Sequence, residues 1–110
     1  MKKIKKFEDQ GRLLEKYGAL LTYHQRRIME QYYDYDLSMA EIAEEEDISR
    51  SAVSEIIKLS TDKLLEYEQG MKLLETEKAL IELLEALEGA SNQERDKIVK
   101  RIKDIITHGI

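Results

Sequence analysis

Residues 37–58 read LSMAEIAEEEDISRSAVSEIIK, and this stretch contains two helix starts that lie eleven residues apart. At the first start, Ser38 can cap the helix while Glu41 reaches back to the cap, which is the pattern of a capping box. At the second start Ser49 is the cap, and no Glu or Gln completes a box there. A helix of about two turns is therefore followed by a tight turn and a second helix. This order predicts a helix-turn-helix motif.

The apolar residues of these two helices predict a shared core. Ile42 and the small Ala43 of the first helix are expected to face Val53 and Ile57 of the second. The second helix then presents a row of other residues outward, namely Arg50, Ser51, Ser54, Glu55 and Lys58. In DNA-binding proteins the corresponding face enters the major groove, so this row is a candidate contact face for nucleic acid or for a partner protein.

The charge of this region argues against duplex DNA as the main partner. Between Ile28 and Ile57 the only basic residue is Arg50, whereas nine residues are acidic, for a net charge of −8. Nucleic-acid binding depends largely on Lys and Arg side chains that neutralise phosphates. We instead expect an acidic surface that suits a basic partner, made by Glu41, Glu44, Glu45, Glu46 and Asp47.

The rest of the chain predicts an all-helical protein. It has 110 residues, no proline and no cysteine, and its long runs are rich in Leu, Ile, Glu and Lys. We expect helices over residues 4–17, over 23–33 behind a capping box at Thr22 and Gln25, and from Ser49 to about Gln69. Gly70 either ends that helix or bends it. Residues 1–70 are expected to form a helix-turn-helix domain, and residues 71–110 a C-terminal helical extension.

Two amphipathic helices are expected in the extension. The first has leucines seven residues apart, at Leu73, Leu80 and Leu87, and it ends at Gly89. The second runs from Asn92 to about Thr107 behind another capping box, and its apolar side holds Ile98, Val99, Ile102, Ile105 and Ile106. Apolar stripes on helices this short need a partner to be stable, inside the chain or across a dimer, and we favour a homodimer.

Basic residues gather near both ends of the chain. The N-terminal group is Lys2, Lys3, Lys5 and Lys6, and the last helix exposes Lys97, Lys100, Arg101 and Lys103. The N-terminal group is interpreted as a solvated helix end, with contact to RNA phosphates as the alternative. No apolar run follows it that would make a signal peptide, and none approaches the roughly 20 residues that a membrane span needs. We therefore expect a soluble, cytoplasmic protein with no membrane partner.

No residue pattern points to catalysis or to a bound cofactor. The five glycines occur singly rather than in a phosphate-binding loop, and His24 has no second ligand at metal spacing. With no cysteine and no clustered histidines, we expect no catalytic, cofactor-binding or metal-binding residues. The protein is accordingly predicted not to be an enzyme.

The segment from Tyr17 to Tyr67 resembles the YlxM family of small helix-turn-helix proteins, which look like region 4 of sigma factors. The most specific matches are LLT-x-x-Q at 20–25, YY at 32–33, DLS-x-x-EIAEE at 36–45 and SR-x-AV at 49–53. The chain departs from the family pattern at Glu46 and Asp47, where the family usually has an apolar residue and then a turn former such as Gly.

The resemblance implies a regulatory or accessory role in the signal recognition particle pathway, through binding of the particle's GTPase, its RNA or both. The alternative is a DNA-binding transcriptional regulator that uses the second helix of the motif, which the fold alone suggests. The acidic charge between Ile28 and Ile57 favours the first reading.

Overall fold

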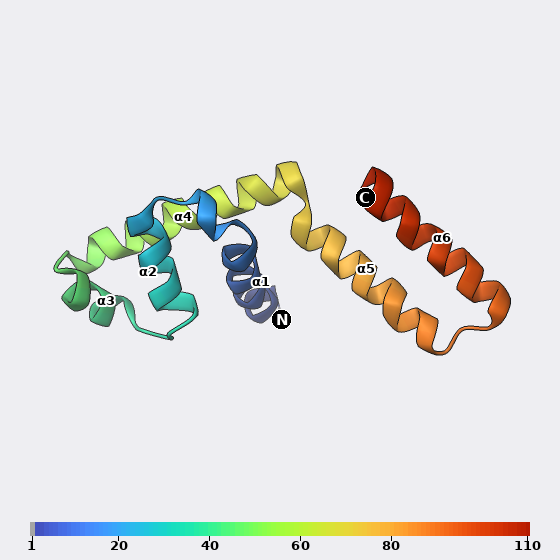
Figure 1. Cartoon of the computed structure of the whole chain (residues 1–110). Helices are drawn as coiled ribbons and strands as arrows, with labels where there is room; N and C mark the ends of the chain where they lie inside the picture. Colours follow the sequence, from blue (N-terminus) through green and yellow to red (C-terminus); the bar gives the residue numbers. More distant parts are fainter. Residues whose placement is uncertain (1) are drawn as a thin grey trace. The chain divides into compact units, whose positions relative to one another are not determined.

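The computed structural model describes residues 2–110, with side chains from Asp9 onward, and all regular structure in that part is helical (Figure 1). This confirms the predicted all-α class. The chain divides into two compact units, Met1–Gly70 and Met71–Ile110. The elements are, in order, α1 (Lys2–Tyr17), the 3-10 helix η1 (Gly18–Leu20), α2 (Tyr23–Tyr33), α3 (Met39–Glu46), α4 (Arg50–Met71), α5 (Leu73–Glu88) and α6 (Asn92–His108).

Short sequence signals set the helix starts. The capping boxes predicted at Thr22, Ser38 and Ser91 all form. In each box the hydroxyl of the cap residue accepts from the backbone N–H three residues later. The side-chain oxygen of that later Glu or Gln accepts in turn from the backbone N–H of the cap residue. Ser49 caps α4 alone, because its Oγ accepts from the N–H of Ala52 at 3.0 Å. These bonds satisfy N–H groups that the first turn of a helix leaves without partners.

All four α-helices of the first unit contribute to its core. The largest fully buried side chains include Tyr17, Ile28, Met29, Ile42, Val53 and Leu64. At one edge of this core the hydroxyl of Tyr17 donates to Oε1 of Glu68 at 2.7 Å. The Tyr17 ring also lies 6.1 Å from that of Tyr67, measured between centroids. The end of α1 is therefore tied to the last turns of α4.

The end of α4 differs from the prediction. The helix continues through Gly70 to Met71, and the break falls at Lys72, which has a left-handed backbone with φ 55°. A glycine inside a helix weakens it, but a helix commonly stops where a residue adopts the left-handed conformation. Lys72 supplies that conformation here, so α4 ends at Met71, two residues beyond the expected end near Gln69.

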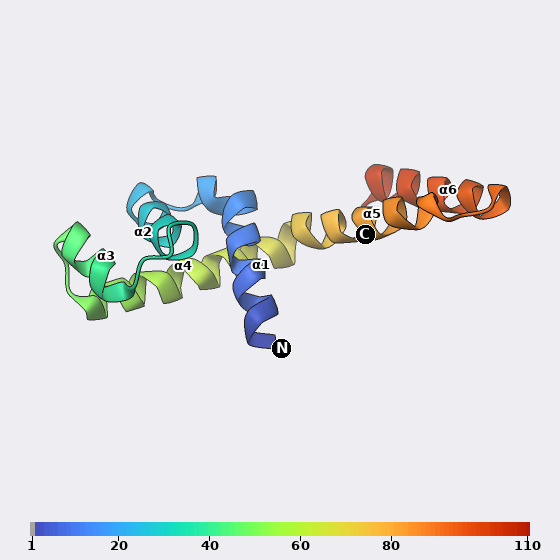
Figure 2. The same cartoon turned by 90° about the horizontal axis from the view of Figure 1, so that it is seen from below.

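The second unit is a helical hairpin. Its helices α5 and α6 run antiparallel and lie side by side in both views (Figures 1 and 2). The loop between them ends at Ser91, whose hydroxyl begins α6 with the predicted capping box. Among the described residues, no helix is long and apolar enough to cross a membrane.

Candidate functional site

The turn between α3 and α4 has the geometry of a helix-turn-helix. Asp47 adopts the left-handed conformation (φ 55°, ψ 46°) at the end of α3. The N–H of Ile48 donates to the carbonyl of Ala43 at 3.1 Å, and that of Asp47 donates to the carbonyl of Glu44 at 3.4 Å. This pair of hydrogen bonds is a Schellman motif, and Asp is among the few residues other than Gly that tolerate its left-handed position. The predicted motif is confirmed.

The outward row of the second helix lies on the surface as the sequence predicts. Arg50, Ser51, Ser54, Glu55 and Lys58 are all exposed on α4. The apolar Leu59 follows directly and is also exposed, by 51%. The row therefore combines two basic groups, one acidic group, two hydroxyls and an exposed leucine, which is a mixed surface rather than a basic one.

Only part of the predicted acidic surface is exposed to solvent. Glu41, Glu44, Glu45 and Asp47 are exposed. The Glu41 carboxylate accepts the backbone N–H of Ser38 at 2.9 Å, and this bond holds the pKa of Glu41 below its usual range. Glu46 is different, because its side chain is only 10% exposed and its carboxylate turns toward α2. The structure thus leaves Glu44, Glu45 and Asp47 as the acidic edge of the motif.

Glu46 joins three side chains of α2 in a polar cluster. Its Oε2 accepts from Nε of Arg27 at 2.7 Å and from Nε2 of Gln31 at 3.0 Å. Nε2 of His24 lies 3.9 Å from Oε1. The hydrogen bond from Arg27 is the main reason that the pKa of Glu46 is lowered. This arrangement, called the Glu46 cluster below, links α2 to the end of α3 immediately before the turn.

Sequence reasoning missed this cluster. The sequence pattern considers His24 only as a possible metal ligand and places Glu46 in the acidic surface. A signal was present, because His24, Arg27 and Gln31 are spaced three and four residues apart and so share one face of α2. A second signal was that Glu46 occupies a position that is usually apolar in the family the sequence resembles. An inward-facing carboxylate needs such donors nearby.

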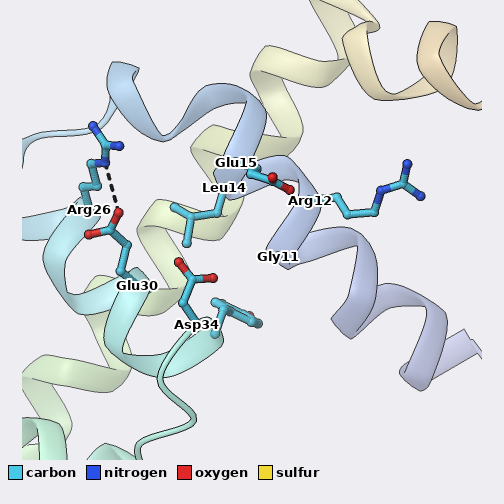
Figure 3. Close-up of a pocket in the computed structure, with 8 residues that line it drawn as sticks. Gly11, Arg12, Leu14, Glu15, Arg26, Glu30 and Asp34 are labelled. Carbon is cyan, nitrogen blue, oxygen red and sulfur yellow. Dashed lines mark hydrogen bonds and ion pairs between the residues drawn. The ribbon is translucent and has the colours of Figure 1, made fainter.

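A hollow of ≈ 710 Å³ lies between α1 and α2 (Figure 3). The carboxylates of Glu15, Glu30 and Asp34 line it, with Arg26 Nε bonded to Glu30 Oε2 at 3.3 Å. Burial raises the pKa of Asp34, and the charges of Glu30 and Glu15 raise it further. Among the described residues no group of three or more His and acidic side chains is placed to hold a metal ion.

The predicted basic patches belong to other helices than α3 and α4. Lys97, Lys100, Arg101 and Lys103 are exposed on α6, in the second unit. The side chains of the N-terminal group Lys2, Lys3, Lys5 and Lys6 lie outside the described residues. The alternative that this N-terminal group contacts RNA phosphates stays a prediction.

Similarity to known proteins agrees with the geometry of the motif. Residues 4–105 match the UPF0122 family, described as "Putative helix-turn-helix protein, YlxM / p13 like". A UPF0122 protein of Clostridium kluyveri is 36% identical over 102 residues, which cover 89% of this chain and 92% of that protein. One from Desulforamulus reducens is 33% identical over 107 residues, with 94% and 92% covered. One from Bacillus cereus is 39% identical over 95 residues, with 86% and 73% covered. The chain belongs to the YlxM/p13-like family of helix-turn-helix proteins.

Proposed function

We propose that the protein is a regulatory or accessory component of the signal recognition particle pathway that binds a basic surface of the particle's GTPase. The role is the one that the family resemblance implies. The acidic charge of the helix-turn-helix is the reason for choosing a basic protein surface as the partner. Glu44, Glu45 and Asp47 form an exposed acidic edge along α3 and its turn, and Arg50 is the first basic residue after them. A GTPase that binds RNA carries basic surface for phosphates, and the acidic edge is complementary to such a surface.

The internal pairing of Glu46 refines the binding surface. Glu46 is satisfied by Arg27 and Gln31, so it does not contribute a free carboxylate to a partner. The acidic edge keeps three exposed carboxylates within four positions even without it. The same three charges would lie against the phosphate backbone if the motif docked on duplex DNA, because the first helix of the motif crosses that backbone.

Exposed apolar side chains on α4 favour a protein partner over a phosphate surface. Leu59 is exposed beside Lys58, and Leu65, seven residues after Lys58, lies on the same side of the helix and is also exposed. Leucine offers no donor to a phosphate or to a base edge, whereas its burial stabilises a protein interface. The outer face of α4 and the acidic edge therefore offer a protein both charge and apolar contact.

The alternative function is DNA binding, and one observation favours it. Arg50 and Lys58 are exposed on the outer face of α4, where a recognition helix meets the major groove. If a groove is read there, Arg50 is the residue best suited to contact a guanine edge.

Charge reversal separates the two functions. We compare Glu44→Lys/Glu45→Lys with a control of equal net charge, Asp96→Lys/Asp104→Lys, whose sites are exposed on α6. The probes are the purified GTPase with and without its RNA, and a duplex DNA library at physiological salt. We expect the first variant alone to slow association with the GTPase, because complementary charge acts mainly on the on-rate. Glu46 is left unchanged, because reversing it would break the Glu46 cluster.

The outcomes are distinguishable. If wild type binds the GTPase and this binding survives removal of the RNA, the protein-partner proposal is supported. Binding to the RNA alone, with no effect of Glu44→Lys/Glu45→Lys, contradicts the proposed acidic edge. A sequence-selective DNA complex that is lost on Arg50→Ala would replace the proposal with the alternative.

A further inference from the structure

The hairpin of the second unit has an apolar row that faces solvent. On α5, Ile81 and Leu84 are exposed by 43% and 53%, and on α6, Val99 and Ile106 are exposed by 38% and 69%. Ile81 and Leu84 are three residues apart and Val99 and Ile106 are seven apart, so each pair follows one side of its helix. Isolated exposed apolar residues are ordinary, but these four lie on two helices that pack against each other.

This row is separate from the stripes that hold the hairpin together. Leu80, Leu87, Ile98 and Ile102 are half-buried and Ile105 is buried, as expected for side chains between the two contacting helices. On α5, Ile81 lies about 100° and Leu84 about 40° around the helix from Leu80, and on α6 Val99 and Ile106 lie about 80–100° around the helix from Ile98, all in the same sense. Because α5 and α6 are antiparallel, a displacement in the same sense around each helix places both pairs of side chains on the same face of the hairpin. The row is therefore a surface that the hairpin's own packing does not use.

The charges around this face are opposite on the two helices. Helix α5 has five acidic residues and one basic, for a net charge of −4, and α6 has five basic and three acidic, for +2. The exposed acids of α5 include Glu82, Glu85 and Glu88, and the exposed bases of α6 include Lys100 and Lys103. Each hairpin therefore carries both an acidic and a basic helix, as a self-complementary two-fold interface requires.

We propose that a second copy of the chain covers this face, with α5 of each copy lying antiparallel against α6 of the other. A two-fold axis parallel to the helices produces this pairing and gives a four-helix bundle. It buries Ile81, Leu84, Val99 and Ile106 and places an acidic helix against a basic one at both contacts. The other two-fold pairing places α5 against α5, and the two acidic helices would then repel each other. This interface is independent of the function proposed for the helix-turn-helix.

The apolar row is tested with substitutions at exposed sites, which leave the monomer's packing intact. We compare Leu84→Asp with Leu20→Asp, because both leucines are 53% exposed, and Ile106→Asp with Tyr35→Asp, at 69% and 71%. Sedimentation equilibrium of the full chain measures the dimer. We expect wild type and the two controls to be dimers at micromolar concentration. Leu84→Asp and Ile106→Asp should each raise the dissociation constant at least about tenfold, because each places a carboxylate in the buried face.

The pairing of helices is tested with two charge variants. One makes α6 acidic (Lys100→Glu/Lys103→Glu) and the other makes α5 basic (Glu82→Lys/Glu85→Lys). Each should dimerise more weakly than wild type, and an equimolar mixture of the two should form a heterodimer of near wild-type affinity. A wild-type chain that sediments as a monomer overturns the proposal. Dimers that Leu84→Asp and Ile106→Asp leave unchanged overturn it as well, and so does a mixture no tighter than its components.

Discussion

Removal of the Glu46 carboxylate should destabilise the first unit more than removal of any neighbouring acid. Glu46→Ala deletes an acceptor that receives bonds from Arg27 at 2.7 Å and Gln31 at 3.0 Å. A hydrogen bond to a charged group contributes about 1.5 kcal/mol or more, and the bond from half-exposed Arg27 contributes less because water screens it. We expect a loss of about 2 kcal/mol, or a melting temperature lower by about 10 °C in a unit of this size.

Two neighbours provide the controls for this prediction. Glu44 and Glu45 lie on the same helix and are exposed, so their replacement by Ala should change stability by less than about 0.5 kcal/mol. Chemical denaturation followed by circular dichroism measures all three variants. In a double-mutant cycle, Arg27→Ala should cost little once Glu46 has been removed. A Glu46→Ala variant as stable as Glu45→Ala would refute the reasoning.

The cluster also predicts a dependence on pH. The folded pKa of Glu46 lies below its ordinary value of 4.5, chiefly because of the hydrogen bond from Arg27. A carboxyl group with a lowered folded pKa stabilises the fold above its unfolded pKa, and that contribution is lost as the pH falls through the folded value. Wild type should therefore exceed Glu46→Gln in stability at neutral pH, and the two should converge in acid below pH 4.5. A constant difference across that range would exclude ionisation of Glu46 as the cause.

Three further changes probe the turn and the hollow. Ser49→Ala should cost about 1 kcal/mol because it removes the cap of α4, whereas Ser51→Ala should be nearly neutral; equal losses in denaturant would place the helix start elsewhere. Asp47→Gly should raise the melting temperature slightly, and Asp47→Val should lower it by several degrees, because a β-branched residue does not suit φ 55°. Asp34→Asn should stabilise the unit at neutral pH, since the raised pKa of Asp34 means that its ionised form opposes folding; this gain should vanish below the unfolded pKa near 3.8, and a gain that persists there would contradict the assignment.

The helix starts could be predicted because their signals are complete within four residues. Thr22 with Gln25, Ser38 with Glu41 and Ser91 with Glu94 each contain both halves of a capping box, so no distant contact is needed. The end of α4 could not be placed in the same way. A left-handed residue ends a helix, and Gly is the usual choice, but Lys72 adopts that conformation although Gly70 is nearby.

The sequence pattern indicates a polar face on α2, but it could not identify Glu46 as the partner of that face, because the residues are distant in sequence. Glu46 lies 15 residues from Gln31 and 19 from Arg27. Only the packing of α2 against α3 brings their side chains together. The Glu46 carboxylate, one of the five that the sequence assigns to the acidic surface, is therefore an internal contact. The exposed row on α4 was predictable, because the residues that face outward are those left over from the apolar pattern.

The bond between Tyr17 and Glu68 determines where the chain can be shortened. A fragment that stops at Lys58 keeps every residue of the helix-turn-helix, but it removes the acceptor of the Tyr17 hydroxyl and the buried Leu64. Loss of that hydrogen bond and an opened core both cost stability, so we expect that fragment to unfold. A fragment that ends at Gly70 keeps both contacts and the whole first unit. The helix-turn-helix that is recognisable in the sequence is thus shorter than the smallest fragment that we expect to fold.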